Sequence, residues 1–477
     1  MKTNRPVGIF LFLTLLLFAS SVLGSGLQTV RGHVLPVTTG LQPLRPLAET
    51  NRLILAISLP LRNQATLSNL LARIYNPASS NYHHYLTPEQ FTEQFGPSQQ
   101  DYQAVVVFAN AHGLRVTGTW SNRVVVDVEG SVGDVERALH TTLNSYQHPT
   151  ENRTFYAPAN EPTLDLSVPV LHISGLDNYE LPRPHLAATR IVPGQNSSPN
   201  AGSGPGGTYK GNDFRAAYVP DSSLNGSGQS VGLLEFDGYS ASDINYYETA
   251  SALPNIPLQN ELIDGASGNP TSPGNADVEV ALDIEMAVSM GTNLSKVVVY
   301  IAPGGAPFED ILNQMAANPQ VGQFSCSWYI PGGTMESAAD QIWEQMAAQG
   351  QSFFCASGDY DAYTGLIPFP GDTPYVTEVG GTTLTTTGPA GNWVSETVWN
   401  RGNGIGSGGG VSTQYPIPSW QTNINMAANK GSTTMRNTPD VAMTAENIYV
   451  RVDGQDYTVG GTSCAAPLWA GFAALAN

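Results

Sequence analysis

The segment 460–467, Gly-Gly-Thr-Ser-Cys-Ala-Ala-Pro, has the composition of a site that exposes a nucleophile. Small residues surround Ser463, and the apolar run 468–476 predicts a helix that begins close to this serine. A helix N-terminus approached through glycines favours a substrate that develops negative charge. Ser463 is therefore a candidate nucleophile. The alternative is a serine or threonine that only caps a buried helix.

A serine nucleophile needs a base, and the usual one is missing from this part of the chain. All eight histidines lie at or before His185, and only three lysines follow it. We therefore expect a carboxylate to accept the proton. Glu279 and Asp283 stand four residues apart in the apolar stretch 276–288, which predicts that one helix face carries both. Such a pair titrates as a unit with one raised pKa, whereas a solvated acidic face is the alternative.

A third carboxylate, Asp359, follows the predicted strand 352–356 in the sequence Ser-Gly-Asp. Open parallel sheets place their sites beyond the carboxyl ends of their strands, which favours a functional acid here. A turn aspartate is the alternative. Cys464, next to Ser463, has no histidine partner, so we interpret it as a small packed residue rather than a reactive thiol.

The elements that must position these residues alternate between strands and helices from about residue 209 onward. Alternation of this kind indicates an α/β fold with a mainly parallel sheet flanked by helices. The predicted strands are 229–236, 296–301 and 352–356, and the predicted helices are 278–290 and 338–348.

Residues 50–180 predict a smaller unit that also contains strands and helices. Thr87-Pro88-Glu89-Gln90 has the residue types of a capped helix start. The order of elements indicates a compact α+β domain of split βαβ type. The predicted strands are 53–59, 114–120 and 123–128, and the predicted helices are 67–74, 101–112 and 131–143.

Two segments have the composition of processing regions. Residues 1–24 combine Lys2 and Arg5 with an apolar run and small residues, the layout of a secretory signal peptide. A single membrane anchor is the alternative, although the run is short for a span, and no later stretch could cross a bilayer. Residues 186–208 are rich in Gly, Pro, Ser and Asn and predict a flexible linker open to proteolysis.

The charge distribution excludes some functions. The net charge is −19, and 26 acidic but only 7 basic residues follow Arg190. This excludes nucleic-acid binding through a basic surface. Because such a surface repels itself at neutral pH, we hypothesise an acidic working environment. Three cysteines form no disulfide framework, and pairing of Cys326 with Cys355 stays open.

In combination, these motifs resemble the sedolisin, or serine-carboxyl peptidase, family, and its kumamolisin-like members in particular. The resemblance implies a subtilisin-like fold preceded by an α+β ferredoxin-like pro-domain. It spans about residues 45–477. The segments that carry it are 82–91, 279–283, 356–359, 369–376, 396–400, 407–412, 439–442 and 460–467.

The resemblance also implies a role for each motif residue. A protonated carboxylic acid can donate a hydrogen bond to a developing oxyanion, which suits acidic pH. Two more residues fall where kumamolisin-like members extend the proton network around the base, with plain strand-end residues as the alternative. The implied roles are nucleophile for Ser463, general base for Glu279, orienting residue for Asp283, oxyanion partner for Asp359, and proton-network residues for Glu235 and Trp328.

We therefore expect a signal peptide at 1–24, a pro-domain at 25–185, a linker with the processing site at 186–208 and a peptidase domain at 209–477. The expected function is that of a secreted, acid-active serine-type endopeptidase made as a zymogen, which cleaves proteins or peptides through an acyl-enzyme. Its own pro-domain would inhibit it, with histidine protonation, at His83 and His84 for example, as a trigger of release. We expect a monomer with no nucleic-acid partner and no stable membrane span after signal removal.

One departure from the family concerns the C-terminus. The chain ends 14 residues after Ser463, whereas family members continue and bind a structural Ca²⁺ in that extension. We therefore expect no metal site in this chain and interpret the sequence as a fragment of a longer product. The competing hypothesis is an inactive or incomplete sedolisin-fold protein that acts as a binding or scaffold protein. A histidine-dependent subtilisin is excluded because no histidine follows His185.

Overall fold

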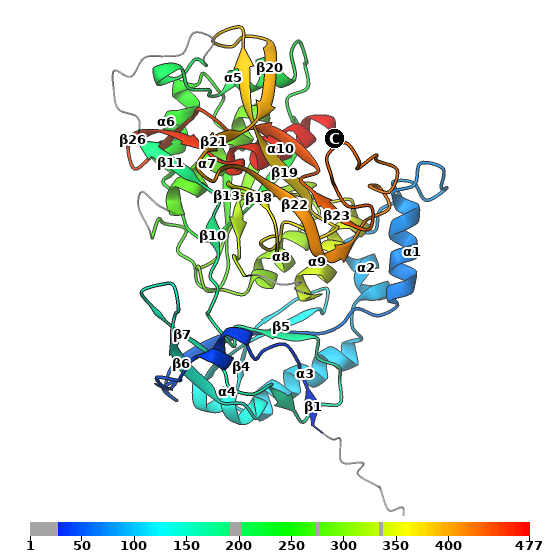
Figure 1. Ribbon diagram of the computed structural model, residues 1–477. Coiled ribbons are helices and arrows are strands. Elements are labelled where there is room, and N and C mark those ends of the chain that lie inside the picture. Colours follow the sequence, from blue (N-terminus) through cyan, green and yellow to red (C-terminus); the bar gives the residue numbers. More distant parts are fainter. Residues whose placement is uncertain (1–26, 191–201, 272–275, 333–336) are drawn as a thin grey trace, which may run out of the picture.

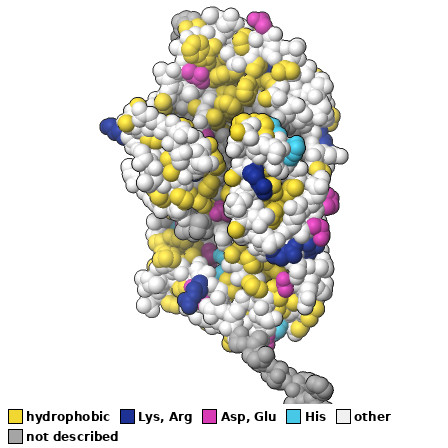
Figure 2. Space-filling model, turned by 90° about the vertical axis from the view of Figure 1, so that its right-hand side faces the viewer, with side chains coloured by type: hydrophobic (Ala, Val, Ile, Leu, Met, Phe, Trp, Pro, Cys, Tyr) yellow, Lys and Arg dark blue, Asp and Glu magenta, His cyan; other side chains and the backbone are white. Residues whose placement is uncertain are grey.

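The computed structural model describes residues 27–190, 202–271, 276–332 and 337–477. The predicted signal peptide and part of the predicted linker lie outside these residues. Figure 1 shows most of a smaller N-terminal unit below a larger unit formed by the rest of the chain, whereas two helices of the smaller unit, within residues 64–95, lie beside the larger one. No helix in the described ranges is long and apolar enough to cross a membrane. The face in Figure 2 carries few charged side chains, as expected from a charged fraction of only 12%.

The described part of the N-terminal unit centres on a four-stranded antiparallel sheet with the order β4-β5-β3-β9. Numbered along the chain, the order is second, third, first, fourth, which is the split βαβ arrangement. The expected α+β ferredoxin-like fold is therefore confirmed. The elements are β3 (Arg52–Ser58), α1 (Gln64–Ile74), α2 (Pro88–Phe95), α3 (Gln99–Ala111), β4 (Arg115–Thr119), β5 (Val125–Ser131), α4 (Val132–Leu139) and β9 (His172–Ser174).

Local signals in the sequence account for the helix starts of this unit. The Thr87 hydroxyl accepts a hydrogen bond from the Gln90 main-chain N–H, and the Gln90 side chain accepts one from the Thr87 N–H, which completes the expected capping box. The predicted helix 131–143 is too long. It ends at Leu139 because His140 adopts a left-handed conformation with φ of 47°, and Leu143 already begins a strand.

The larger unit contains, in its described part, an eight-stranded sheet with the order β13-β14-β12-β15-β17-β19-β20, and β24 also pairs with β19. Its strand pairs are parallel except for β19 with β20, which confirms the expected α/β class. The strands are β12 (Ser230–Glu235), β13 (Leu258–Leu262), β14 (Lys296–Ile301), β15 (Gln323–Cys326), β17 (Ser352–Ala356), β19 (Thr377–Thr386), β20 (Trp393–Val398) and β24 (Val441–Thr444).

Two helix pairs pack against this sheet. Helix α7 (Ala276–Met290) packs on α10 (Thr462–Ala476), and α10 also lies over β15, β17 and β19. Helix α8 (Phe308–Ala316) packs on α9 (Ser337–Gln349), on the side that faces the N-terminal unit (Figure 1). The other helices are α5 (Asn212–Tyr218) and α6 (Ala241–Ala250), with short 3₁₀ turns at Pro36–Gly40 and Pro205–Gly207.

Several small antiparallel sheets complete the molecule. The strand after the N-terminal unit, β11, pairs with β26, so the predicted flexible linker is extended and paired at its first residues. Composition did not reveal this pairing because the partner strand is far away in the chain. The remaining strands are β1 (Gln28–Thr29), β2 (Arg45–Pro46), β6 (Leu143–Gln147), β7 (Thr154–Pro158), β8 (Thr163–Leu164), β10 (Arg183–Pro184), β11 (Ala187–Arg190), β16 (Trp328–Tyr329), β18 (Tyr360–Tyr363), β21 (Asn400–Gly402), β22 (Ile405–Pro416), β23 (Met435–Thr438), β25 (Ile448–Val452) and β26 (Gln455–Gly460).

The two units share a buried polar interface. The Asn122 amide, between β4 and β5, donates to Asn313 Oδ1 at 2.7 Å and to Gln345 Oε1 at 2.9 Å. The Ser174 hydroxyl donates to Glu309 Oε1 at 2.7 Å. Because buried polar groups are costly when unpaired, these bonds fix one docking arrangement of the two units.

The same interface contains a pair of carboxyl groups. Asp127 of β5 accepts a hydrogen bond from Trp120 Nε1 at 2.8 Å and shares another with Asp310 of α8. Burial raises the pKa of Asp127 to about 6 and the pKa of Asp310 well above its usual range. The nearby carboxylates Asp264 and Glu309 act in the same direction. The docked arrangement therefore favours a proton between the two units.

We predict that Asp310→Asn stabilises the full chain at neutral pH. A raised carboxyl pKa means that the docked state is most stable in acid and loses stability as the pH rises through the folded pKa. Asparagine keeps a hydrogen-bond donor and cannot ionise. The thermal midpoint at pH 7–8 should rise, and its decline between pH 5 and 8 should become shallower. The exposed Asp165→Asn is the control; equal pH dependence of both variants would contradict this account.

Candidate active site

Ser463 is the second residue of α10 and is fully buried. Its hydroxyl donates a hydrogen bond to the main-chain carbonyl of His185, a residue from the end of the N-terminal unit. The His185 N–H in turn donates to the Ser327 carbonyl at 3.0 Å. A peptide group of the chain itself thus lies against the candidate nucleophile.

The segment that carries this peptide group is extended on both sides of His185. Before it, β10 pairs antiparallel with β16, and after it, β11 pairs antiparallel with β26, the strand that leads into α10. The His185 ring stacks on Tyr329 with 3.9 Å between ring centroids. Extended chain paired in this way is how peptides bind along the edge of a sheet.

Three fully buried carboxyl groups form a chain that leads away from Ser463. Glu279 lies within hydrogen-bonding reach of the Ser463 hydroxyl, and Asp283 lies between Glu279 and Glu235. Both Glu279 and Asp283 come from α7, four residues apart, whereas Glu235 is the last residue of β12. Trp328 Nε1 closes the chain by donating to Glu235 Oε2 at 2.8 Å.

The hydrogen bonds indicate which carboxyl group holds the negative charge. Burial raises the pKa of all three well above their usual ranges. Asp283 accepts a hydrogen bond from the Ser327 hydroxyl at 2.8 Å and lies within hydrogen-bonding reach of Glu235 and Glu279, and all three contacts lower its pKa. Its charge in turn raises the pKa of both glutamates. These contacts favour the negative charge on Asp283 over the two glutamates.

Asp359 lies on the other side of Ser463, three residues after the end of β17. Its Oδ1 accepts from the Thr462 main-chain N–H at 2.8 Å and from the Thr462 hydroxyl at 3.0 Å. Burial raises the pKa of Asp359 to about 7. An acid with this pKa is protonated in weakly acidic solution and can donate a hydrogen bond there.

The structure thus brings all six predicted site residues into one buried cluster at the carboxyl end of the sheet. Sequence reasoning missed two residues that contact them, Ser327 and Thr462. Each directly precedes a residue that had been singled out, so proximity to those motifs was the available signal. The alternatives of a solvated acidic helix face and of a turn aspartate do not match the burial of Glu279, Asp283 and Asp359.

The three cysteines are buried and free. Cys326 and Cys355 lie directly opposite each other on the neighbouring strands β15 and β17. Burial raises the pKa of the Cys464 thiol well above its usual range, which fits an inert packed residue.

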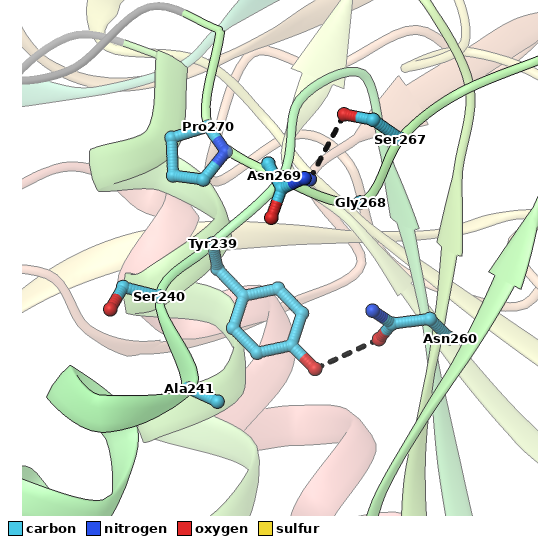
Figure 3. A pocket seen from close by; sticks show the side chains of 8 residues that line it. All are labelled: Tyr239, Ser240, Ala241, Asn260, Ser267, Gly268, Asn269 and Pro270. Atoms are coloured by element: carbon cyan, nitrogen blue, oxygen red, sulfur yellow. Dashed lines mark hydrogen bonds between the residues drawn. The ribbon is translucent and has the colours of Figure 1, made fainter.

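An open pocket of about 400 Å³ lies beyond β12 and β13 and is separate from this cluster. Figure 3 shows the Tyr239 hydroxyl donating to Asn260 Oδ1, at 2.8 Å, across it. None of the six predicted site residues lines this pocket, and its walls carry no charged side chain. The lining residues are Tyr239, Ser240, Ala241, Asn260, Ser267, Gly268, Asn269 and Pro270.

Comparisons with known proteins identify the family. Residues 39–179 match the family model described as the pro-kumamolisin activation domain. Over 414 residues, the chain is 30% identical to kumamolisin of Bacillus sp. (strain MN-32), which covers 82% of this chain and 74% of that protein. The chain belongs to the sedolisin family. It is accordingly a serine-carboxyl peptidase, a hydrolase, with an N-terminal pro-domain.

Another relative of this sedolisin-family chain agrees. Sedolisin of Pseudomonas sp. (strain 101) is 30% identical over 467 residues, with 90% of this chain and 77% of that protein covered. A solved structure of Pseudomonas sedolisin, complexed with two molecules of pseudo-iodotyrostatin, aligns with a TM-score of 0.48 at 27% identity. That alignment covers 56% of this chain and 81% of the solved chain.

We predict that Gly461→Ala removes most of the peptidase activity. A Cβ atom at this position would stand 2.6 Å from Asp359 Oδ2 and 2.9 Å from the His185 carbonyl oxygen, where no carbon fits. The matched control is Gly304→Ala, because a Cβ there has nothing within 4 Å. The rate of peptide hydrolysis is measured for both variants, and circular dichroism verifies that both fold. Equal activity of the two would contradict the geometry.

Proposed function

We propose that this sedolisin-family peptidase is a secreted, acid-active endopeptidase that is made as a zymogen and cleaves peptide bonds through Ser463, Glu279 and Asp283. The observation that carries the proposal is the contact between the Ser463 hydroxyl and the His185 peptide carbonyl. That carbonyl occupies the place of a substrate carbonyl, with buried acids on both sides of it.

Acylation follows from the proton arrangement. Ser463 Oγ forms a bond to the substrate carbonyl carbon, and its proton passes to Glu279 as the proton of Glu279 passes to Asp283. The carbonyl electron pair moves onto oxygen, where protonated Asp359 donates a hydrogen bond. When the C–N bond breaks, the amine leaves with a proton from Glu279, and Asp283 returns its proton to Glu279, which restores the starting arrangement. Water then repeats the same steps on the acyl-enzyme and releases the acid product.

Acid activity is supported by the requirement that Asp359 hold a proton. With a pKa of about 7, Asp359 loses its donor function as the pH rises through neutrality. The chain of Glu235, Asp283 and Glu279 needs only one negative charge to accept the serine proton. A carboxyl chain with these properties works at a pH where histidine would be protonated and inactive as a base.

The zymogen proposal rests on the segment between the two units. β10, His185 and β11 occupy the space along which a substrate would lie, so the pro-domain blocks the site that it precedes. We propose the organisation of a signal peptide at 1–24, a pro-domain at 25–185, a processing linker at 186–208 and a peptidase domain at 209–477. The signal peptide supports export.

The Ca²⁺ that the family resemblance implies finds no fitting site in the described ranges. These contain no group of three or more His, Cys, Asp or Glu side chains placed to hold a metal ion.

We predict that Ser463→Ala and Glu279→Gln each lower kcat by roughly 10⁴-fold or more, because nucleophile and base act as one unit. Asp359→Asn should lack the loss of activity that the parent shows as the pH rises through about 7. Hydrolysis of casein and of a fluorogenic peptide at pH 3–8 measures both. Glu261→Gln, on β13, is the control. Undiminished proteolysis by Ser463→Ala would contradict the mechanism.

Two stacked histidines, His33 buried and His172 half-buried, make the pro-domain sensitive to acid. The His33 and His172 rings stack with 4.5 Å between centroids, and burial lowers the pKa of each to about 4. His33 also lies 3.9 Å from Glu161, which raises its pKa, but burial outweighs this. A lowered histidine pKa means stability that is complete above about pH 6.5 and lost as the pH falls toward 4. His83 and His84 are exposed, so the stacked pair of His33 and His172 is the better trigger.

We predict that His172→Phe slows autoprocessing at pH 4. Phenylalanine preserves the stacking on His33 but cannot take up a proton, so the pro-domain keeps more of its stability in acid. The appearance of the processed peptidase on gels over time provides the rate, with His83→Gln as the exposed control. Identical processing rates for the two variants would exclude the stacked pair of His33 and His172 as a trigger.

A further inference from the structure

The two carboxyl oxygens of Asp359 have different surroundings. Oδ1 accepts two hydrogen bonds, both from Thr462, through its main-chain N–H at 2.8 Å and its hydroxyl at 3.0 Å. Oδ2 has no hydrogen-bond partner among the described residues. In a protonated carboxyl group, the oxygen without the proton is the better acceptor, so the two bonds favour a proton on Oδ2.

The direction of the Thr462 hydroxyl is itself fixed. Its oxygen accepts a hydrogen bond from the Gly358 N–H at 2.9 Å, so its hydrogen is free to point at Asp359. Thr462 is fully buried, and no solvent competes for either bond. The Gly358 N–H therefore holds this hydroxyl in one orientation.

Oδ2 also lies on the side of the substrate position. A Cβ atom built on Gly461 would approach both Oδ2 and the His185 carbonyl oxygen within 3 Å, so the two oxygens lie near the same face of Gly461. The His185 carbonyl is the group that receives the Ser463 hydroxyl bond. A proton on Oδ2 therefore lies next to the place where an oxyanion would form, whereas a proton on Oδ1 would face Thr462.

We propose that Thr462 is a positioning residue that keeps the Asp359 proton on Oδ2 and thereby aims it at the oxyanion of the substrate. This proposal rests on the proposed function of Asp359 as oxyanion donor and adds a residue to it. Thr462 exchanges no proton and forms no covalent bond in the reaction.

The proposal predicts two separable effects when the hydroxyl is removed. Oδ1 would keep only the main-chain bond, so the proton would spend more time on the wrong oxygen and kcat would fall. The Thr462 hydroxyl bond also lowers the pKa of Asp359, so its loss would move the alkaline limb of the pH profile upward. KM should change little, because the effect belongs to the transition state.

Thr462→Val is the central variant, because valine has nearly the shape of threonine and no hydroxyl. We expect kcat to fall by roughly tenfold to a hundredfold, less than loss of a whole oxyanion donor, with the alkaline limb moved to higher pH. Thr462→Ser keeps the hydroxyl and should restore both kcat and the limb. Should Thr462→Val fail to fold, Thr462→Cys, with its weak donor, should show the same two effects in a milder form.

The outcomes separate this proposal from the proposed function. A parental kcat and pH profile in Thr462→Val, together with inactive Ser463→Ala and Asp359→Ala, would overturn the role of Thr462 alone. A lower kcat without the upward movement of the alkaline limb would assign Thr462 a purely structural role and would also overturn it. Full activity of Asp359→Ala would instead remove the proposed oxyanion donor.

Discussion

The arrangement of the site depends on the cost of burying several carboxyl groups in one dry region. Glu235, Glu279 and Asp283 are fully buried and close together, so the group can hold one negative charge at moderate cost but not three. The neighbouring residues of the site stabilise this single charge. Ser327 and Trp328 donate hydrogen bonds to the carboxyl chain, and α7 holds two of the acids on one face, buried along nearly its whole length.

The cost of burying unpaired polar groups also shapes the contact between the two units. The segment around His185 satisfies the Ser463 hydroxyl, so the docked arrangement is also a well-paired one. Two further titratable pairs have pH dependences of opposite sign, one at the contact and one inside the N-terminal unit. The Asp127–Asp310 pair favours docking in acid, whereas the stacked His33 and His172 weaken the N-terminal unit there. In this picture, acid acts on the fold of the pro-domain more than on its docking surface.

Much of the fold could be predicted from the sequence, because its signals are local. The capping box at Thr87 and the strand at 296–301 follow from residues close together in the chain, and both have the expected bounds. The end of α4 and the pairing of β11 were missed for the opposite reason. The left-handed conformation of His140 and a partner strand more than two hundred residues away do not affect the local hydrophobic periodicity from which elements are predicted.

The sequence by itself determined the chemistry available to the site. A serine after glycines, two acids four residues apart and no histidine after His185 leave a carboxylate as the base. Only the tertiary structure decided where the charge and the protons reside, because burial and hydrogen bonds set a pKa and both come from distant residues. The contact between Ser463 and His185 spans 278 positions, and the one between Thr462 and Asp359 spans 103. Which oxygen of Asp359 accepts the Thr462 bonds is therefore a property of the fold, not of the motif.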